Sequence, residues 1–531
     1  MSAFLIVIYA VCGIYMVLNF RYDLQMFQQN SYRISRYWKW LKPNIGSSWR
    51  LVDVACLFLM MATLLDVRLA AFIVALCCVT KVFLLLKRKY KKPLVMTKRV
   101  WRLYTLTALL AVGAEVAVAI CTAGGDFWGG YSGVTLTVGM VMLLSIFSWA
   151  VVIVADVLLM PVEKMIQQRY INDAKRILRG MPDLRIIGIT GSYGKTSTKH
   201  YLHRILSEEF DVVMTPGSFN TPMGVVRTVR EIMKPYNQIF ICEMGAKNIG
   251  DIKEICDIVH PQMGIITAVG PMHLESFKTL ENVCRTKFEL VDALPAAGFA
   301  AINNDFDQCA NRAVSNTHAV RYGITNPKGC DYVATDIHYT PEGTAFTVKG
   351  PDGFSLDLET RLLGEGNISD LLAAVVMALH LGMRPESIRY AVASIAQVEH
   401  RLSIKQTPGG VTIIDDAFNS NPSGSKMAVD VLAHFKDGKR IIVTPGMIEL
   451  GAEQYRLNEE FGKYMGAALD VIIVVGEYNR DAIVSGVKST GFPTDNLHIA
   501  SSFNEAQQIL AGMLKRGDTV LYENDLPDTF K

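Results

Sequence analysis

Residues 188–198 read Gly-Ile-Thr-Gly-Ser-Tyr-Gly-Lys-Thr-Ser-Thr, a glycine-rich turn between two apolar runs. The run at 185–190 predicts a buried strand, and the spacing of apolar residues in 196–208 predicts a helix. A turn of this kind presents successive backbone N–H groups and a helix N-terminus, which together bind phosphate. Five residues separate Gly188 from Gly194, one more than in the strict P-loop pattern, so the stretch is a variant P-loop.

The side chains of this loop have expected roles in nucleotide binding. Lys195 is expected to reach the outer phosphates, and the Thr196 hydroxyl is expected to bind Mg²⁺. The alternative interpretation is an ordinary glycine turn before a helix. The predicted ATP-binding residues of the loop are Gly191, Ser192, Tyr193, Gly194, Lys195, Thr196 and Ser197.

The composition divides the chain into an apolar first third and a more polar remainder. Of the 531 residues 50% are apolar and 19% are charged, which indicates a membrane part joined to a globular part. The net charge of +3 identifies no class of partner, and no nucleic-acid partner is expected. The ten cysteines form no Cys-x-x-Cys pair, so they are expected to be reduced and to act as small hydrophobes.

Five apolar runs in the first third predict transmembrane helices, at 3–20, 51–66, 69–86, 103–122 and 133–160. Each is near the length of about 20 residues that crosses a hydrocarbon core of about 30 Å. The second run is divided from the third only at Asp66, Val67 and Arg68, so four spans are the alternative count. A signal peptide is the rival interpretation of the first run, but no cleavage site follows it.

The charges between these runs predict their orientation. Basic residues cluster in 21–50 and 87–102, whereas 123–132 has none. Because basic loops stay in the cytoplasm, the N-terminus is expected outside, with an odd number of spans. Everything after residue 160 is then expected in the cytoplasm, where ATP is available.

The remainder of the chain predicts two α/β domains behind a short connector. Apolar strand-like runs alternate with helical stretches, which is typical of a mostly parallel sheet covered by helices. The segment 329–362 predicts a small antiparallel insert, and the last part predicts a Rossmann-like unit. The predicted divisions are a transmembrane region at 1–160, an amphipathic connector at 161–182, an ATP-binding domain at 183–395 and a C-terminal domain at 396–531.

Two polar residues follow predicted strands of the ATP-binding domain. Glu243 ends the run at 238–244, and His273 follows the run at 263–269. Ligands of parallel sheets gather at the carboxyl ends of strands, so the two side chains are candidate Mg²⁺ ligands near the P-loop. The alternatives are a helix-capping carboxylate and an ordinary loop histidine.

Several segments carry a resemblance to a known family. The P-loop, the run Glu-Met-Gly-Ala at 243–246 and the run Gly-Pro-Met-His-Leu-Glu at 270–275 resemble the ATPase domain of the Mur ligases. The resemblance is to the MurF branch, which adds D-alanyl-D-alanine to a UDP-muramoyl peptide. The run Ile-Ile-Asp-Asp-Ala-Phe-Asn-Ser-Asn-Pro at 413–422 agrees with the same branch, and the likeness covers about 183–520.

The resemblance implies further site residues in the ATP-binding domain. The loop at 217–224 is expected to face the acceptor, through Asn220 and Thr221. Lys287 resembles a lysine that is carbamylated and helps to hold a second Mg²⁺. A lysine reacts with CO₂ only as the neutral amine, so this role needs a depressed pKa. The alternative for Lys287 is a solvated helix face.

The resemblance also assigns residues around the nucleotide and the incoming amine. Asn367 corresponds to a residue that contacts adenine, although the residue before it, usually histidine, is glycine here. Arg401 is expected to reach the γ-phosphate, where a planar guanidinium neutralises phosphoryl charge. Asp416 is expected near the nucleotide and the amine, with Asn419 and Asn421 as substrate-binding residues.

Two departures from the family limit what the resemblance implies about substrates. Membrane segments stand where Mur ligases have a domain that binds the UDP part of the acceptor. The chain also ends in an acidic stretch after residue 522, where MurF has a Lys-Gly-Ser loop near the incoming dipeptide. The acceptor is therefore open between a UDP-linked and a lipid-linked muramoyl peptide, and the amine between an amino acid and a dipeptide.

These features predict an ATP-dependent amide ligase of cell-envelope or peptidoglycan biosynthesis. Its expected location is the bacterial inner membrane, with multiple spans, a lipid bilayer as partner and cytoplasmic catalytic domains. The expected cofactors are ATP and Mg²⁺, and the expected catalytic residues are Lys195, His273, Lys287, Arg401 and Asp416. The alternatives are a membrane synthase that exports an amide-linked polymer and a non-catalytic ATP-responsive scaffold.

Overall fold

The computed structural model describes residues 3–46, 48–61, 66–87, 93–122, 133–340, 343–398, 401–417 and 420–525. It divides into two compact units, Met1–Gln168 and Arg169–Lys531, and each is described by itself.

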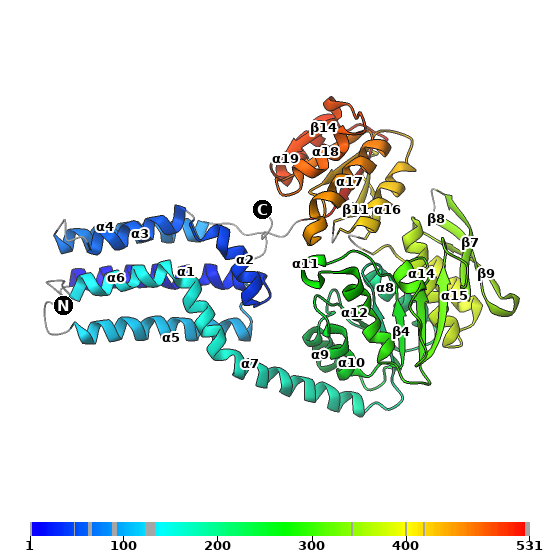
Figure 1. Cartoon of the computed structure of the whole chain (residues 1–531), viewed down its shortest axis with the longest axis horizontal. Helices are drawn as coiled ribbons and strands as arrows, with labels where there is room; N and C mark the ends of the chain where they lie inside the picture. The colour runs from blue at the N-terminus through cyan, green and yellow to red at the C-terminus, as the bar shows by residue number, and fades with distance from the viewer. Residues whose placement is uncertain are drawn as a thin grey trace. The chain divides into compact units, whose positions relative to one another are not determined.

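The first unit is a bundle of helices. Helices α1, α3, α4, α5 and α6 lie side by side with their axes roughly aligned (Figure 1). Helix α1 packs against α4, α5 and α6, and α3 packs against α4 and α6. The helices of this unit are α1 (Ala3–Gln29), α2 (Ile34–Asn44), α3 (Ser48–Met61), α4 (Val67–Lys87), α5 (Lys98–Cys121), α6 (Gly133–Ile146) and the first part of α7 (Ser148–Arg179).

Several helices of this unit could span a membrane. Within the described residues, Val7–Gln29, Val67–Lys87 and Lys98–Cys121 are long and apolar enough. A fourth span results if α6 and α7, bent by 74° at their junction, cross together. Four spans are the alternative count given above, and the count of five stays a prediction.

The predicted connector begins inside a helix. Helix α7 is continuous from Ser148 to Arg179 and contains Pro161, the first residue of the predicted connector. The chain instead breaks between α6 and α7, at Phe147. A proline removes one backbone hydrogen bond and often bends a helix without ending it. The amphipathic segment is thus the second half of a longer helix.

The two predicted basic segments meet at one end of the bundle. The Gln28 amide exchanges hydrogen bonds of 2.9 and 3.0 Å with the backbone of Val95, which joins the last turn of α1, inside the first basic segment, to the segment before α5. Arg102 forms two hydrogen bonds of 2.6 and 2.9 Å with the Glu163 carboxylate of α7. Both basic segments and the start of the connector therefore share this end of the unit.

Two buried carboxylates inside the bundle are paired with cations. Asp53, which the sequence places within an apolar run, accepts hydrogen bonds from Lys81 at 2.6 Å and from Tyr15 at 2.7 Å. Asp23 likewise accepts from Arg50 at 3.0 Å and is fully buried. Buried charges persist where such partners compensate for the lost water. These pairs join helices α1, α3 and α4.

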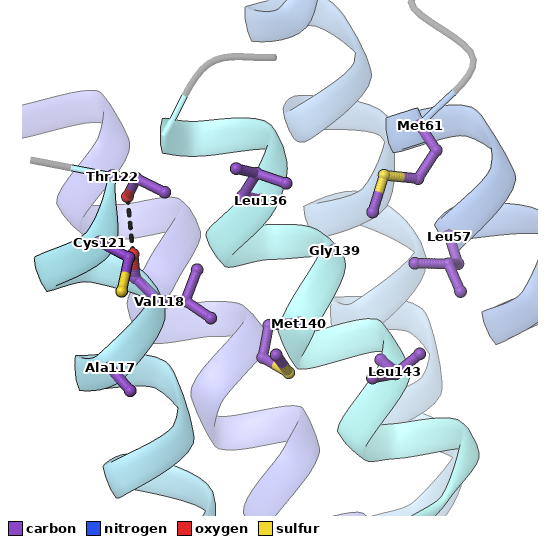
Figure 2. Close-up of a pocket in the computed structure, with 10 residues that line it drawn as sticks. All are labelled: Leu57, Met61, Ala117, Val118, Cys121, Thr122, Leu136, Gly139, Met140 and Leu143. Carbon is purple, nitrogen blue, oxygen red and sulfur yellow. Dashed lines mark hydrogen bonds between the residues drawn. The ribbon is translucent and has the colours of Figure 1, made fainter. Parts of the chain in front are cut away.

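A cavity of 410 Å³ lies between α3, α5 and α6 (Figure 2). Its lining is almost entirely apolar, and the Thr122 hydroxyl donates within its own helix, to the Val118 carbonyl at 2.9 Å. Gly139 allows the close approach of Met61 across the α3–α6 contact. None of the predicted site residues lines this cavity.

The second unit begins with a lobe built on a nine-stranded sheet, which we call the nucleotide lobe. The strand order is β2-β3-β1-β4-β5-β6-β7-β8-β9, parallel up to β7 and antiparallel thereafter. The strands are β1 (Arg185–Thr190), β2 (Val212–Met214), β3 (Ile239–Glu243), β4 (Met263–Ile266), β5 (Phe299–Asn303), β6 (His318–Gly323), β7 (Tyr332–Thr340), β8 (Gly343–Lys349) and β9 (Ser355–Thr360).

Helices cover both faces of this sheet because successive strand residues point to opposite sides. In β1, Ile187 and Ile189 join the core with α8 and α14, whereas Ile186 joins the core with α9, α10 and α12. The main helices are α8 (Lys195–Leu206), α9 (Pro222–Glu231), α10 (Asp251–Val259), α11 (Leu274–Phe277), α12 (Leu280–Asp292), α13 (Asp307–Ala310), α14 (Glu365–His380) and α15 (Pro385–Ala393).

The C-terminal lobe is built on a six-stranded sheet of order β10-β11-β15-β12-β13-β14, in which only β10 is antiparallel. Its strands are β10 (Ser403–Gln406), β11 (Thr412–Asp416), β12 (Arg440–Thr444), β13 (Val471–Val475), β14 (Leu497–Ala500) and β15 (Thr519–Glu523). Its helices are α16 (Pro422–Ala433), α17 (Gln454–Ala468), α18 (Arg480–Lys488) and α19 (Phe503–Met513).

The predicted mostly parallel sheet and its antiparallel extension are confirmed. The segment 329–362 forms the hairpins β7–β8 and β8–β9, which lengthen the nucleotide-lobe sheet. Strands β6, β10 and β14 were not predicted. They have four to six residues and partly exposed faces, so their apolar content is too low to mark them in the sequence.

Candidate active site

The P-loop sits between β1 and α8, at the centre of the parallel strands. Strand β1 pairs with β3 on one side and β4 on the other, so the ends of those strands flank the loop. Gly194 caps α8 with φ of 77°, and a Cβ there would overlap the Asp370 carboxylate. Glycine is required at this position by both the backbone and the close approach.

The loop is fixed to the segment after β4. The Ser192 hydroxyl donates to the Gly270 carbonyl at 3.0 Å and accepts from the Gly270 amide at 3.1 Å. The Tyr193 hydroxyl donates to the Pro271 carbonyl at 3.0 Å. These bonds give the loop a defined shape, which is what a backbone phosphate cradle needs.

Lys195 folds over its own loop. Its Nζ donates to the carbonyls of Gly191 at 2.8 Å and Ser192 at 3.2 Å. Burial lowers the pKa of Lys195 to about 8, and the nearby Arg401 guanidinium adds to this effect. A polyphosphate would reverse the shift, because an anion favours the charged ammonium.

Glu243 at the end of β3 collects three donors beside the P-loop. Lys199 pairs with it at 2.9 Å, Asn220 donates at 2.9 Å, and the Thr196 hydroxyl lies 3.2 Å from both carboxylate oxygens. Burial alone would raise the pKa of Glu243, but Lys199 and Lys195 hold it below its usual value. The carboxylate is therefore charged at neutral pH.

This arrangement fits Mg²⁺. Thr196 and Glu243 offer a hydroxyl and a carboxylate at the mouth of the P-loop, and Mg²⁺ typically takes one or two carboxylates with phosphate oxygens and waters. Within the described residues, no three His, Cys, Asp or Glu side chains gather as a metal site.

His273 contacts the C-terminal lobe, and its role as a metal ligand stays a prediction. Its Nδ1 forms a hydrogen bond with the Glu449 carboxylate of the C-terminal lobe, and Lys247 pairs with the other oxygen of Glu449 at 3.3 Å. Burial lowers the pKa of His273 more than the neighbouring Glu449 raises it. Because a carboxylate only accepts, Nδ1 carries the proton and Nε2 is left as an acceptor or metal ligand.

Lys287 meets the condition that carbamylation imposes. It lies on α12 and is 2% exposed. Burial holds the pKa of Lys287 well below its usual value, and the charge of Lys195 adds to this, against the opposing effects of Asp251 and Glu289. The solvated-face alternative is therefore excluded, although the modification itself stays a prediction.

Arg401 and Asp416 bring the C-terminal lobe to the P-loop. Burial lowers the pKa of the Arg401 guanidinium, and the carboxylates of Asp416, Glu243 and Asp370 oppose that shift from nearby. Burial and the neighbouring Glu523 raise the pKa of Asp416 to about 7. Asp416 also accepts a hydrogen bond from the Leu402 amide at 3.1 Å.

Asn367 is buried at the start of α14, with its amide already engaged. Its Oδ1 accepts from the Tyr201 hydroxyl at 2.8 Å, and its Nδ2 donates to the Leu363 carbonyl at 2.8 Å. The glycine before it, Gly366, allows the thioether of Met427 on α16 to approach closely, where a Cβ would overlap the sulfur. The family histidine has no room here with Met427 in this position.

The predicted substrate residues have local roles in the structure. Thr221 caps α9 by accepting from the Gly224 amide at 3.3 Å, and Asn421 caps α16 by accepting from the Gly424 amide at 2.8 Å. Asn220 holds Glu243, as described above. Asn419 lies outside the described residues, so its predicted role stays a prediction.

Three residues near the site were not predicted. Lys199 is fully buried against Glu243, Asp370 packs on Gly194, and Glu449 contacts His273. Burial raises the pKa of Asp370 to about 7. The only sequence signal was the spacing of Lys199, one turn after Lys195 on the same helix face.

Comparisons with known proteins place this site in a family. The Mur ligase middle domain matches residues 189–378, and the Mur ligase glutamate ligase domain matches residues 400–522. The UDP-N-acetylmuramoyl-tripeptide–D-alanyl-D-alanine ligase of Haemophilus influenzae is 30% identical over 332 residues, which cover 61% of this chain and 70% of that protein. The chain belongs to the Mur ligase family.

Other Mur ligases agree with this assignment. The Escherichia coli enzyme of the same name is 32% identical over 298 residues, covering 56% of this chain and 65% of that enzyme. MurF from Acinetobacter baumannii superposes with a TM-score of 0.62 at 26% identity, covering 68% of this chain and 78% of that one. MurF from Thermotoga maritima in complex with ADP gives 0.60 at 26% identity, covering 68% and 80%. The helical unit at the N-terminus is extra to this MurF-like core.

Proposed function

We propose that this Mur ligase family member joins an acceptor carboxylate to an amine with hydrolysis of ATP, through an acyl phosphate. The observation that carries this is the convergence of Lys195 on the P-loop with Arg401 from the other lobe, around the Glu243 carboxylate. Two fixed cations from two lobes suit a phosphoryl group that passes between bound substrates. ATP as the nucleotide is supported by the ADP complex of the Thermotoga relative.

The first step is phosphoryl transfer. An oxygen of the acceptor carboxylate attacks the γ-phosphorus of ATP, and the bond to the β-phosphate oxygen breaks, which leaves ADP and an acyl phosphate. Lys195 and Arg401 neutralise the equatorial oxygens, and the P-loop amides orient the chain of phosphates. Thr196, Glu243 and His273 would hold Mg²⁺, and carbamylated Lys287 would help to hold a second Mg²⁺, which would supply additional charge neutralisation.

The second step forms the amide. The nitrogen of the incoming amine attacks the acyl carbon, inorganic phosphate leaves, and the amine loses a proton. Asp416 is positioned near this step, because it lies beside Arg401 at the end of β11 and has a pKa of about 7. Asn220, Thr221, Asn419 and Asn421 belong to the loops that face the acceptor and the amine in this proposal.

Replacing Lys195 tests the role of the P-loop. Lys195→Ala should lower kcat at least a hundredfold, since loss of one such fixed donor raises the barrier by about 2.7–4 kcal/mol. The assay is ATP-dependent release of inorganic phosphate by the full chain in detergent. Lys253→Ala removes an exposed lysine paired with Asp257 and serves as the control. Near wild-type turnover of Lys195→Ala would refute the assignment.

The substrates are proposed from the relatives. The printed names of the related enzymes specify a UDP-N-acetylmuramoyl tripeptide and D-alanyl-D-alanine. We propose a muramoyl peptide as the acceptor, either UDP-linked or lipid-linked, and an amino acid or dipeptide as the amine. The unmatched N-terminal part and the acidic residues Glu523 and Asp525 keep both choices open.

The N-terminal unit is proposed to be a membrane anchor of the bacterial inner membrane. Three of its helices are long and apolar enough to span, and large apolar side chains such as Ile120, 71% exposed, cover its surface. Its two basic segments lie at one end, together with the start of the connector. Since basic ends stay in the cytoplasm, this arrangement supports cytoplasmic catalytic lobes. We also propose the domain divisions after residues 160, 182 and 395, where the apolar part, the connector and the ATP-binding domain are predicted to end.

A further inference from the structure

The contact between Glu449 and His273 joins the two lobes at the active site. Glu449 lies in the loop after β12 of the C-terminal lobe, and His273 lies in the loop after β4 of the nucleotide lobe. Besides the side-chain contact, the Glu275 amide donates to the Glu449 carbonyl at 3.4 Å. A Cβ on Gly451 would lie 3.2 Å from the Glu275 amide nitrogen, so the two loops pack backbone to backbone.

Both partners hold a backbone conformation that residues other than glycine seldom adopt. The φ angle is 52° at His273 and 62° at Glu449. Such conformations raise the energy by roughly 1–3 kcal/mol each and persist where the surroundings determine them. The two strained residues are the two that contact each other. This indicates that the surrounding structure maintains the contact between His273 and Glu449.

The loop that carries Glu449 is held by three amide side chains. Asn458 accepts from the Met447 amide at 2.9 Å and donates to the Met447 carbonyl at 3.1 Å. Asn479 donates to the same carbonyl at 2.9 Å, and Gln454 accepts from the Leu450 amide at 3.1 Å. Asn458 is fully buried and Asn479 is 4% exposed. A fully bonded polar network of this kind fixes one loop conformation.

The chemistry of the contact fixes the imidazole. Glu449 accepts a hydrogen bond from the Nδ1–H of His273, which orients the ring and leaves the lone pair on Nε2. A ligand histidine typically donates its other N–H to a carboxylate, and loss of that carboxylate weakens metal binding about 10–100-fold. Here that carboxylate is supplied by the other lobe.

We propose that Glu449 is a positioning residue, which fixes His273 from across the lobe interface and so links docking of the C-terminal lobe to metal binding at the nucleotide site. The inference rests on the proposed function, in which His273 is a ligand of Mg²⁺. It adds that the metal site is complete only when the lobes are docked. Lys247, whose side chain is 39% exposed, holds the second oxygen of Glu449 in a peripheral pair.

The test uses Mn²⁺ with ADP as the probe, because its binding can be followed by electron paramagnetic resonance without turnover. Glu449→Gln in the full chain in detergent should weaken Mn²⁺ binding in the presence of ADP by about tenfold or more. Glu453→Gln alters an exposed carboxylate paired with Arg456 nearby and should change nothing. Lys247→Met should change the affinity less than about twofold, as expected for an exposed pair.

A double variant separates positioning from simple destabilisation. If Glu449 acts through His273, then Glu449→Gln should add no further loss of Mn²⁺ affinity in a His273→Ala background. Losses of Mn²⁺ affinity that multiply in the double variant would overturn the proposal. So would wild-type Mn²⁺ affinity in Glu449→Gln with an unchanged Tm. Wild-type protein that binds Mn²⁺ with ADP but ligates no substrate would refute the proposed function and leave this inference to be judged by the variants alone.

Discussion

Asp370 places a carboxyl group against the P-loop, where an anionic ligand is expected to bind. Burial raises its pKa to about 7, against the lowering effects of Thr198, Arg401 and Lys195. A polyphosphate favours the protonated form, so nucleotide binding takes up a proton at pH 7–8. The affinity for ADP should therefore fall as the pH rises through 7.

The Asp370→Asn variant should lack this pH dependence. At pH 8 it should bind ADP about tenfold more tightly than the wild type does, a difference of about 1.4 kcal/mol in binding free energy. The measurement is the ADP dissociation constant of both proteins from pH 6 to 8. The ratio of the two constants cancels the titration of ADP itself. A ratio that stays constant over this range would contradict the assigned role of Asp370.

Lys199 and Glu243 form a buried pair that supports the same site. Lys199 is fully buried, and its Nζ also donates to the Gly217 carbonyl at 2.6 Å. Breaking such a pair leaves one charge uncompensated and destabilises by about 3–5 kcal/mol. Lys199→Met should therefore lower the Tm by about 10 °C in a thermal melt.

The double variant Lys199→Met with Glu243→Gln removes both charges and should recover part of that loss. Lys253→Met, at an exposed pair on α10, provides the control and should melt like the wild type. An unchanged Tm in Lys199→Met would show that the pair does not stabilise the fold.

The role of a single residue can be predicted from the sequence when the groups that define this role lie close together in the chain. The P-loop side chains follow from one short stretch, because glycines, Lys195 and Thr196 stand in a fixed order. Lys199 was missed because its burial depends on Glu243, which is distant in the sequence. Glu449 was missed as a site residue for the same reason, since its partner His273 comes from the other lobe.

Helices α14 and α16 meet where Gly366 departs from the family pattern. The Gly366 amide points at the Met427 sulfur, 3.1 Å away, and a side chain at 366 would overlap that atom. Gly366→Ala should therefore push α16 away or force Met427 into another rotamer, at about 1–3 kcal/mol. The melting temperature and the KM for ATP both report this change.

The matched rescue is Met427→Ala in the Gly366→Ala background, which restores the space that the Cβ takes. Recovery of the wild-type KM in the double variant is expected, because the two helices can then approach again. A single Gly366→Ala variant with wild-type Tm and KM would show that this helix contact has no role in nucleotide binding.

The bounds of helices and strands were predicted best where the pattern of apolar residues alone determines them. Strand β1 has the predicted bounds, 185–190, because it is a short buried run that ends at the P-loop. The helices of the first unit were harder, since apolar composition does not mark where a chain bends. The bend between α6 and α7 at Phe147 falls inside the predicted run 133–160, which is apolar on both sides of it.

At the scale of the whole molecule, the proposed membrane orientation can be tested with inserted tags. An epitope tag inserted within 123–132 should be digested by protease added to intact spheroplasts, because that segment has no basic residue and is expected outside. A tag after Lys531 should resist until the membrane is opened, since the catalytic lobes are expected in the cytoplasm. Digestion of the C-terminal tag in intact spheroplasts would contradict the orientation.

The central claim is ligation of an amine to an acceptor carboxylate with consumption of ATP. The most direct measurement is inorganic phosphate release by the full chain in detergent, with UDP-linked and lipid-linked muramoyl peptides, amino acids and D-alanyl-D-alanine, and mass spectrometry of the product. The account predicts an amide product that requires acceptor, amine and ATP together and falls at least a hundredfold in Lys195→Ala. Phosphate release that needs no acceptor, or no product with any pair in the panel, would contradict it.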